Sequence, residues 1–369
     1  MTVPLIDLRA QYRALKPHID RAIRRVVDGG QFILGPEVES LERELAAYCG
    51  TRYAVGVASG TDALELSLRA CGIGPGDDVL TTAFSFFATA GAIVAVGARP
   101  VFVDIEPATY NLDADELALR VTRRTKAIIP VHLFGHPCNM GALLRLAQKH
   151  HLAVIEDCAQ AIGARFRGRR VGSFGTAAAL SFYPSKNLGG YGDGGMVVTN
   201  DRRVAERVRL LRVHGSKARY RHTALGTNSR LDELQAAILR VKLRRLNAWN
   251  RARRRHAVRY AEAFRRLGLT EVGLPRELPG CEHVYHLYSV RLRRRDRVQR
   301  ALTQQGIATQ VAYPLTLPSQ PALASFRRGR FPRAEQAARQ ILALPMYPEL
   351  TPLVIERVAR ALSRALKSA

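Results

Sequence analysis

The chain has 369 residues, a length that corresponds to roughly two domains. Hydrophobic residues make up 47% and charged residues 24%, which is the composition of a globular protein and excludes a disordered chain. No apolar run reaches the roughly 18 residues that a membrane-spanning helix needs, and the first residues lack the basic flank and apolar stretch of a signal peptide. We therefore expect a soluble, cytoplasmic protein that does not engage a membrane.

The formal net charge of +26 is of the kind that nucleic-acid-binding proteins carry. However, 50 of the 57 basic residues are arginines and only 7 are lysines, an imbalance that an arginine-rich coding bias would produce. The arginines are spread through mixed-charge helical stretches and are densest from Arg240 to Arg266. We therefore expect no nucleic-acid partner. The basic surface instead favours small anions such as phosphates or nucleotide sugars.

From residue 53 to 200, short apolar runs alternate with amphipathic stretches. The expected strands lie at 53–57, 78–82, 100–104, 127–132, 152–156, 177–183 and 196–199, and the expected helices at 61–71, 86–96 and 140–150. This alternation predicts βαβ units and an α/β fold whose mainly parallel sheet is covered on both faces. In such sheets, ligands bind beyond the carboxyl ends of the strands.

After residue 200 the pattern changes. Helical periodicity runs through 202–212 and 231–267, and a smaller α+β region follows with extended segments at 284–292 and 309–313 and helices at 334–342 and 353–366. We place the large domain, with an N-terminal arm, at 1–250 and the small C-terminal domain at 251–369.

The cysteines are odd in number, widely spaced and form no C-x-x-C pair, so we expect free, mostly buried thiols. They are Cys49, Cys71, Cys138, Cys158 and Cys281. The segment from His132 to Cys138 also contains His136 and could be taken for a metal site, but no partner cluster of ligands accompanies it. We expect no metal.

One of the seven lysines stands apart from the others. Lys186 follows the expected strand 177–183 and precedes a glycine-rich turn at 189–195, which places its amine at the ligand-binding edge of the sheet. An amine whose charge is partly suppressed there can form a Schiff base, although an ordinary loop lysine remains the alternative. The other six lysines lie in polar or amphipathic surroundings and are expected to be solvated: Lys16, Lys126, Lys149, Lys217, Lys242 and Lys367.

Three further features occur at or near strand ends. Ser59-Gly-Thr-Asp62 joins a strand to a helix and could hold phosphate or simply cap the helix. Asp157 could keep a proton on a heterocyclic nitrogen or serve as a cap, and Phe86 could cover a flat ring or pack in the core. A lysine, a phosphate cradle, a carboxylate and an aromatic plate are together what pyridoxal phosphate requires.

Several motifs in order resemble those of the DegT/DnrJ/EryC1/StrS family of sugar aminotransferases. The strongest are Ser59-Gly-Thr-Asp-Ala-Leu64, Ile155-Glu-Asp-Cys-Ala-Gln-Ala161, Ser181-Phe-Tyr-Pro-Ser-Lys-Asn-Leu-Gly189 and Asn228-Ser-Arg-Leu-Asp-Glu-Leu-Gln-Ala236. The resemblance extends over nearly the whole chain. It implies an aspartate-aminotransferase-like fold of type I, with a mainly parallel seven-stranded sheet in the large domain and a smaller α+β domain.

The resemblance also implies a cofactor, pyridoxal 5′-phosphate, which becomes pyridoxamine 5′-phosphate during turnover. Lys186 would form the internal aldimine and then shuttle a proton, and Asp157 would pair with the pyridinium nitrogen. The remaining cofactor contacts implied are Gln160 to the phenolic oxygen, Phe86 on the ring face, and Gly60, Thr61 and Ser181 at the phosphate. Asn228 would reach the phosphate in the neighbouring subunit, which implies a homodimer with shared active sites.

The closer resemblance is to the branch that aminates C3 of a dTDP-linked 3-keto-6-deoxyhexose. By this analogy the residues that contact the hexose are Tyr183, Tyr220, His222 and Tyr313. Two positions depart from similar proteins, because Ala312 and Pro318 stand where histidines are common. These departures leave the sugar, the nucleotide and the keto position open.

The implied reaction is ping-pong transfer from glutamate, or glutamine, to the ketosugar nucleotide. Alternatives are amination at C4, a cyclitol ketone as acceptor, and a non-catalytic regulator that binds the cofactor or DNA. A dehydratase or deoxygenase of the family would carry histidine in place of Lys186.

Overall fold

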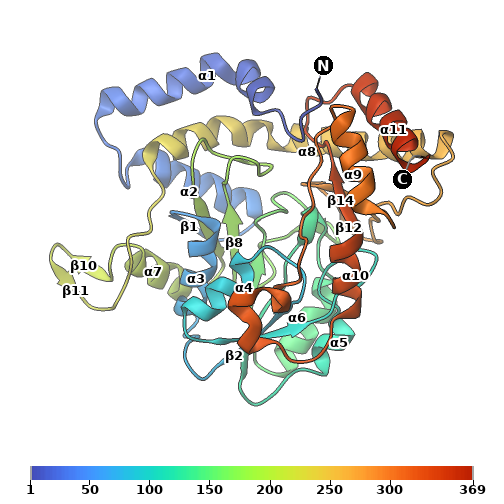
Figure 1. Cartoon of the computed structure of the whole chain (residues 1–369). Coiled ribbons are helices and arrows are strands. Elements are labelled where there is room, and N and C mark those ends of the chain that lie inside the picture. Colours follow the sequence, from blue (N-terminus) through green and yellow to red (C-terminus); the bar gives the residue numbers. More distant parts are fainter. Residues whose placement is uncertain (1, 368–369) are drawn as a thin grey trace.

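The computed structural model describes residues 2–367, and its centre is a seven-stranded sheet (Figure 1). The strand order is β1-β9-β8-β5-β4-β2-β3. Only β9 runs antiparallel to its neighbours, which confirms the predicted α/β fold with a mainly parallel sheet. The strands are β1 (Tyr53–Val57), β2 (Asp78–Thr82), β3 (Arg99–Val103), β4 (Thr125–Ile129), β5 (Ala153–Asp157), β8 (Ala177–Ser181) and β9 (Gly195–Thr199).

Successive residues of the central strands are buried against opposite layers of helices. Ala177 and Ala179 of β8 join a cluster with α3 (Gly60–Ala70), α4 (Ala88–Ala95) and α7 (Arg202–Leu211). Ala178 and Leu180 join a second cluster with α2 (Pro36–Cys49) and the first part of α8 (Glu233–Arg266). Because both faces are covered, these strands read as continuous apolar runs in the sequence.

Beyond β3 and β4, α5 (Ala114–Ala118) and α6 (Met140–Lys149) complete the covering of the sheet. At the N-terminus, α1 (Leu8–Gly29) packs on α8 through Leu15, Ile19 and Ile238. No helix among residues 2–367 is both long and apolar enough to cross a membrane.

The C-terminal elements share a core of their own with the second half of α8. They are α9 (Arg295–Gln304), α11 (Pro352–Lys367) and the antiparallel pair β13 (Tyr288–Arg291) and β14 (Ile341–Leu344). Val3 joins this core, so the N-terminal arm lies beside the C-terminal elements (Figure 1). The helix α10 (Pro332–Gln340) instead packs in a cluster with Phe84 and Phe102, beside the central sheet. The extended segment expected at 309–313 forms only one bridge, between Gln310 and Ala343.

Three very short strands form a separate small sheet at the side of the molecule: β6 (Arg165–Phe166), β7 (Arg169–Arg170) and β12 (Cys281–Glu282). A hairpin of β10 (Ser216–Ala218) and β11 (Arg221–His222) projects away from the body of the chain (Figure 1). All five cysteines are free, and four are buried, as predicted.

The expectation that Lys242 is solvated is wrong. Its side chain is fully buried on α8, where the ammonium donates to the Gly189 carbonyl at 2.6 Å and lies 4.4 Å from the centre of the Tyr191 ring. The basic composition of α8 does not reveal this contact. The helix presents one face to solvent and another to the glycine-rich loop, and composition alone does not show which face carries Lys242.

Candidate active site

A cavity of about 610 Å³ lies at the carboxyl ends of the central strands. Asp157 ends β5, Ser181 ends β8, and Ser59 and Ser85 follow β1 and β2 closely. The cavity brings together nine of the twelve site residues expected from the sequence: Gly60, Thr61, Phe86, Asp157, Gln160, Ser181, Tyr183, Lys186 and Tyr313. These nine residues thus lie together at the sheet edge where the strand ends were expected to bring them.

Lys186 lies in the loop after β8, where its backbone N–H donates to the Tyr183 carbonyl at 2.8 Å. Burial lowers the pKa of its amine to about 8, and the negative charge of Asp157 opposes part of that shift. A larger fraction of the amine is therefore neutral near physiological pH than for a solvated lysine. A neutral amine is the form that attacks a carbonyl carbon.

Asp157 is buried, and both of its carboxylate oxygens accept hydrogen bonds. Oδ1 accepts from the Ala159 N–H at 3.1 Å, and Oδ2 accepts from the Thr89 hydroxyl at 2.9 Å. Burial raises the pKa of Asp157, while these two bonds and the charge of Lys186 act in the opposite direction. The carboxylate is thus oriented by its own partners and keeps an electrostatic link to the lysine.

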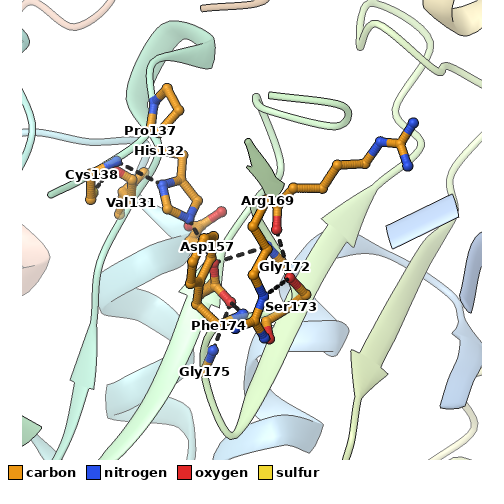
Figure 2. A network of polar contacts seen from close by, with 12 residues as sticks. Val131, His132, Pro137, Cys138, Asp157, Arg169, Gly172, Ser173, Phe174 and Gly175 are labelled. Carbon is orange, nitrogen blue, oxygen red and sulfur yellow. Dashed lines mark hydrogen bonds and ion pairs between the residues drawn. The ribbon is translucent and has the colours of Figure 1, made fainter. Parts of the chain in front are cut away.

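The neighbouring residue on β5, Glu156, anchors this strand end from the opposite face. Its Oε1 accepts from the N–H groups of Phe174 and Gly175 at 2.8 Å, and its Oε2 accepts from Gly172 N–H at 2.9 Å. Figure 2 shows the 172–175 turn wrapped around this network close to Asp157. A fully buried carboxylate with this many donors fixes the position of β5.

His132 completes the network (Figure 2). Its Nδ1 accepts from the Cys138 N–H at 2.9 Å, so its proton lies on Nε2, which is 3.1 Å from Glu156 Oε2. Although His132, Glu156 and Cys158 lie close enough together to suggest a metal site, both ring nitrogens of His132 already have protein partners. Hydrogen bonding accounts for the position of this histidine.

The start of α3 offers backbone N–H groups next to the cavity. The Ser59 hydroxyl caps the helix by accepting from the Asp62 N–H at 3.1 Å. Gly60 allows close packing there, since a Cβ at this position would lie only 2.7 Å from the Cβ of Ser181. A helix N-terminus beside a serine hydroxyl is suited to binding a phosphate group.

Gln160 and Tyr313 are joined across the cavity. The Gln160 amide donates to the Tyr313 hydroxyl at 2.7 Å, while its oxygen accepts from the Phe134 N–H at 2.8 Å. The Tyr313 ring stacks on Phe134 and lies 6.2 Å from the ring of Phe86. Burial raises the pKa of Tyr313, so its hydroxyl stays protonated.

The remaining three expected residues lie outside the cavity formed by the described part of this chain. Tyr220 is 84% exposed on the projecting hairpin, and His222 on the same hairpin bonds the His214 carbonyl at 2.9 Å. Asn228 is exposed and bridges to Val213. A single chain therefore does not bring these residues to Lys186.

The cavity also contains residues that the sequence analysis did not single out, among them Ser85, His286, Met346 and the N-terminal arm residues Leu5 and Ile6. Of the two positions that depart from similar proteins, Ala312 lines the cavity, whereas Pro318 is buried and is not among the lining residues. Thr89 was also missed, because a threonine in an apolar helical stretch gives no signal of its own.

The chain is similar over nearly its whole length to proteins that carry different functional names. It is 50% identical to the pleiotropic regulatory protein of Geobacillus stearothermophilus, covering 97% of this chain and 98% of that one. It is 49% identical to the dTDP-3-amino-3,4,6-trideoxy-alpha-D-glucose transaminase of Streptomyces venezuelae (94% and 92% covered). It is 48% identical to the UDP-N-acetyl-3-dehydro-alpha-D-glucosamine 3-aminotransferase of Acidithiobacillus ferrooxidans (99% and 98% covered).

Solved structures agree with these relatives. DesV of S. venezuelae, in complex with a ketimine intermediate, matches with a TM-score of 0.96 and 47% identity, covering 99% of both chains. NtdA of Bacillus subtilis, with bound cofactor PMP, matches with a TM-score of 0.90 and 32% identity over 98% of this chain and 83% of that one. The model of the DegT/DnrJ/EryC1/StrS aminotransferase family matches residues 14–363. The chain therefore belongs to this family and is a transaminase.

Proposed function

We propose that the protein transfers an amino group from glutamate to C3 of a dTDP-linked 3-keto-6-deoxyhexose, with pyridoxal 5′-phosphate as cofactor. The observation that carries the proposal is the pairing of Lys186, whose pKa burial lowers to about 8, with the buried carboxylate of Asp157 in one cavity. Desolvated groups of opposite charge in a cleft are typical of catalytic sites.

The residues of the cavity fit this cofactor, which supplies an electron sink when it is bound. Gly60, Thr61 and Ser181 would hold the phosphate, and Asp157 would hold a proton at the ring nitrogen. Lys186 would bond covalently to the cofactor and, once released, move a proton at its Nζ. Because the Gln160 amide uses one N–H on Tyr313, its second N–H is available for the phenolic oxygen. Phe86, 56% exposed, would cover the ring and exclude water.

The names of the relatives support the choice of substrate. One is named as a transaminase for a dTDP-linked 3-amino sugar and another as a 3-aminotransferase for a UDP-linked sugar. The basic character of the chain suits either nucleotide diphosphate. Tyr183 and Tyr313 line the cavity and would contact the hexose.

We propose further that the active unit is a homodimer. Tyr220 and Leu225 are 84% and 89% exposed on a segment that projects from the body of the chain (Figure 1). In a dimer with shared sites, Tyr220, His222 and Asn228 would complete the cavity of the partner. That arrangement gives a function to side chains that lie outside their own chain's cavity.

Steady-state kinetics with a panel of acceptors test the proposal. Initial rates measured against glutamate and the dTDP-3-keto-6-deoxyhexose should give parallel double-reciprocal lines, and intersecting lines would contradict ping-pong transfer. A higher kcat/KM for a UDP-linked sugar, a 4-ketosugar or a cyclitol ketone would reassign the acceptor. The same comparison with glutamine tests the donor.

A further inference from the structure

A buried threonine holds the carboxylate that the proposed function places at the cofactor's ring nitrogen. Thr89, in the first turn of α4, is fully buried, and its hydroxyl lies 2.9 Å from Asp157 Oδ2. Behind it, Ser85 Oγ lies 3.0 Å from Thr89 Oγ1. The three side chains come from two segments 68 residues apart in the sequence.

The direction of both bonds follows from counting protons. An ionised carboxylate only accepts, so the single hydroxyl proton of Thr89 is donated to Asp157. Thr89 has no second proton, and the bond to Ser85 must therefore be donated by Ser85. The result is a relay of two hydrogen bonds, from the Ser85 hydroxyl to the Thr89 hydroxyl and from Thr89 to the Asp157 carboxylate, in which each bond strengthens the other.

The two hydroxyl residues of this relay lie on the same short segment as Phe86, the aromatic residue proposed to cover the cofactor ring. Ser85 and Phe86 both line the cavity, and Phe86 is followed closely by the start of α4. Asp157 Oδ2 is thus tied to the segment that carries Phe86, while Oδ1 is tied to the Ala159 N–H of its own loop. The carboxylate is fixed from two sides, so its rotation is restricted.

We propose that Thr89, supported by Ser85, is a positioning residue that orients Asp157. The hydrogen bond from Thr89 also lowers the affinity of the Asp157 carboxylate for a proton, so that the proton stays on the cofactor's ring nitrogen. This inference depends on the proposed function, because it requires pyridoxal phosphate in the cavity. It adds two residues to the site, neither of which would touch the reacting atoms.

The test compares three variants of the cofactor-loaded enzyme. Thr89→Val keeps the shape of the side chain but removes the hydroxyl, Thr89→Ser keeps the hydroxyl, and Ser85→Ala removes only the supporting donor. The readout is the ¹⁵N NMR shift of the ring nitrogen in labelled cofactor, which reports its protonation directly. In parallel, kcat and KM are measured for both substrates.

The wild type and Thr89→Ser should give a protonated ring nitrogen. In Thr89→Val, the signal should move toward neutral pyridine and kcat should fall by at least about tenfold, with KM little changed, because a hydrogen bond to a charged group is lost. Ser85→Ala should shift the ring-nitrogen signal in the same direction by a smaller amount. If Thr89→Val does not fold, the signal of Ser85→Ala tests the inference in its place.

A ring-nitrogen signal unchanged from the wild type in Thr89→Val, or in Ser85→Ala where Thr89→Val cannot be obtained, would overturn the inference and leave the proposed function intact. A wild-type protein that fails to bind the cofactor would instead refute the proposed function itself. The two failures are therefore distinguishable.

Discussion

Lys186 and Asp157 carry opposite charges in one cavity, and burial drives both toward their neutral forms. It lowers the pKa of the lysine to about 8 and raises that of the aspartate, while their mutual attraction limits both shifts. At the scale of single residues, this balance is the basis of the proposed chemistry.

The pKa of Lys186 sets the pH dependence of cofactor capture. Only the neutral amine attacks the aldehyde, so the rate at which cofactor-free protein bonds to pyridoxal phosphate should rise with pH and level off above about 8. Stopped-flow absorbance measures this rate. A rate that continues to rise toward pH 10, as for a solvated lysine, would contradict the assigned environment.

Asp157→Asn should retain the cofactor but slow transfer by at least about a hundredfold, because an amide cannot stabilise a proton on the ring nitrogen. Cofactor retention is measured by dialysis. The transfer rate is measured in a single turnover, as the decrease in absorbance of the cofactor band after glutamate is added. Asp115→Asn, on α5, is a suitable control for the loss of one negative charge. A near-normal rate in Asp157→Asn would remove Asp157 from this role.

At the scale of secondary-structure elements, buried carboxylates fix the end of a strand and the start of a helix. Glu156 holds the end of β5 through the 172–175 turn, and Glu233 accepts from three backbone N–H groups of the segment that begins α2: Gly35, Glu37 and Val38. These contacts join segments far apart in the chain.

Glu156→Gln should lower the free energy of unfolding by at least about 2 kcal/mol. The amide nitrogen would face N–H donors, leaving at least one buried group without an acceptor. Urea denaturation checks this, with Glu39→Gln as a matched control because the Glu39 side chain is 66% exposed. Equal stability of the two variants would show that Glu156 does not hold the turn.

The strands, the long helix and the positions of Lys186 and Asp157 were predictable because they follow from local periodicity and from where strands end. Thr89 and Glu156 were not, since their importance comes from partners elsewhere in the sequence. Lys242 was predicted wrongly for a related reason: composition does not show which face of a basic helix is buried. Sequence patterns predict elements, whereas contacts between distant segments need the structure.

At the scale of the whole molecule, the projecting hairpin and Asn228 bear on assembly. If each site combines Lys186 of one chain with Asn228 of the other, a dimer of Lys186→Ala with Asn228→Ala contains one intact site and one doubly altered site. Two variants that are each inactive should then recover about a quarter of wild-type activity after subunit exchange. Failure to recover activity in isolated mixed dimers would show that the sites are not shared.

The most direct test of the whole account is the visible absorption spectrum of the purified protein through one catalytic cycle, with Lys186→Ala recorded beside it. We predict a band from lysine-bound cofactor that glutamate bleaches and a dTDP-3-keto-6-deoxyhexose restores, and we predict that the variant lacks this cycle. Bleaching without restoration would keep the transaminase and reject this acceptor. A wild-type protein that shows no band when the cofactor is supplied, or a band that glutamate leaves unchanged, would contradict the account.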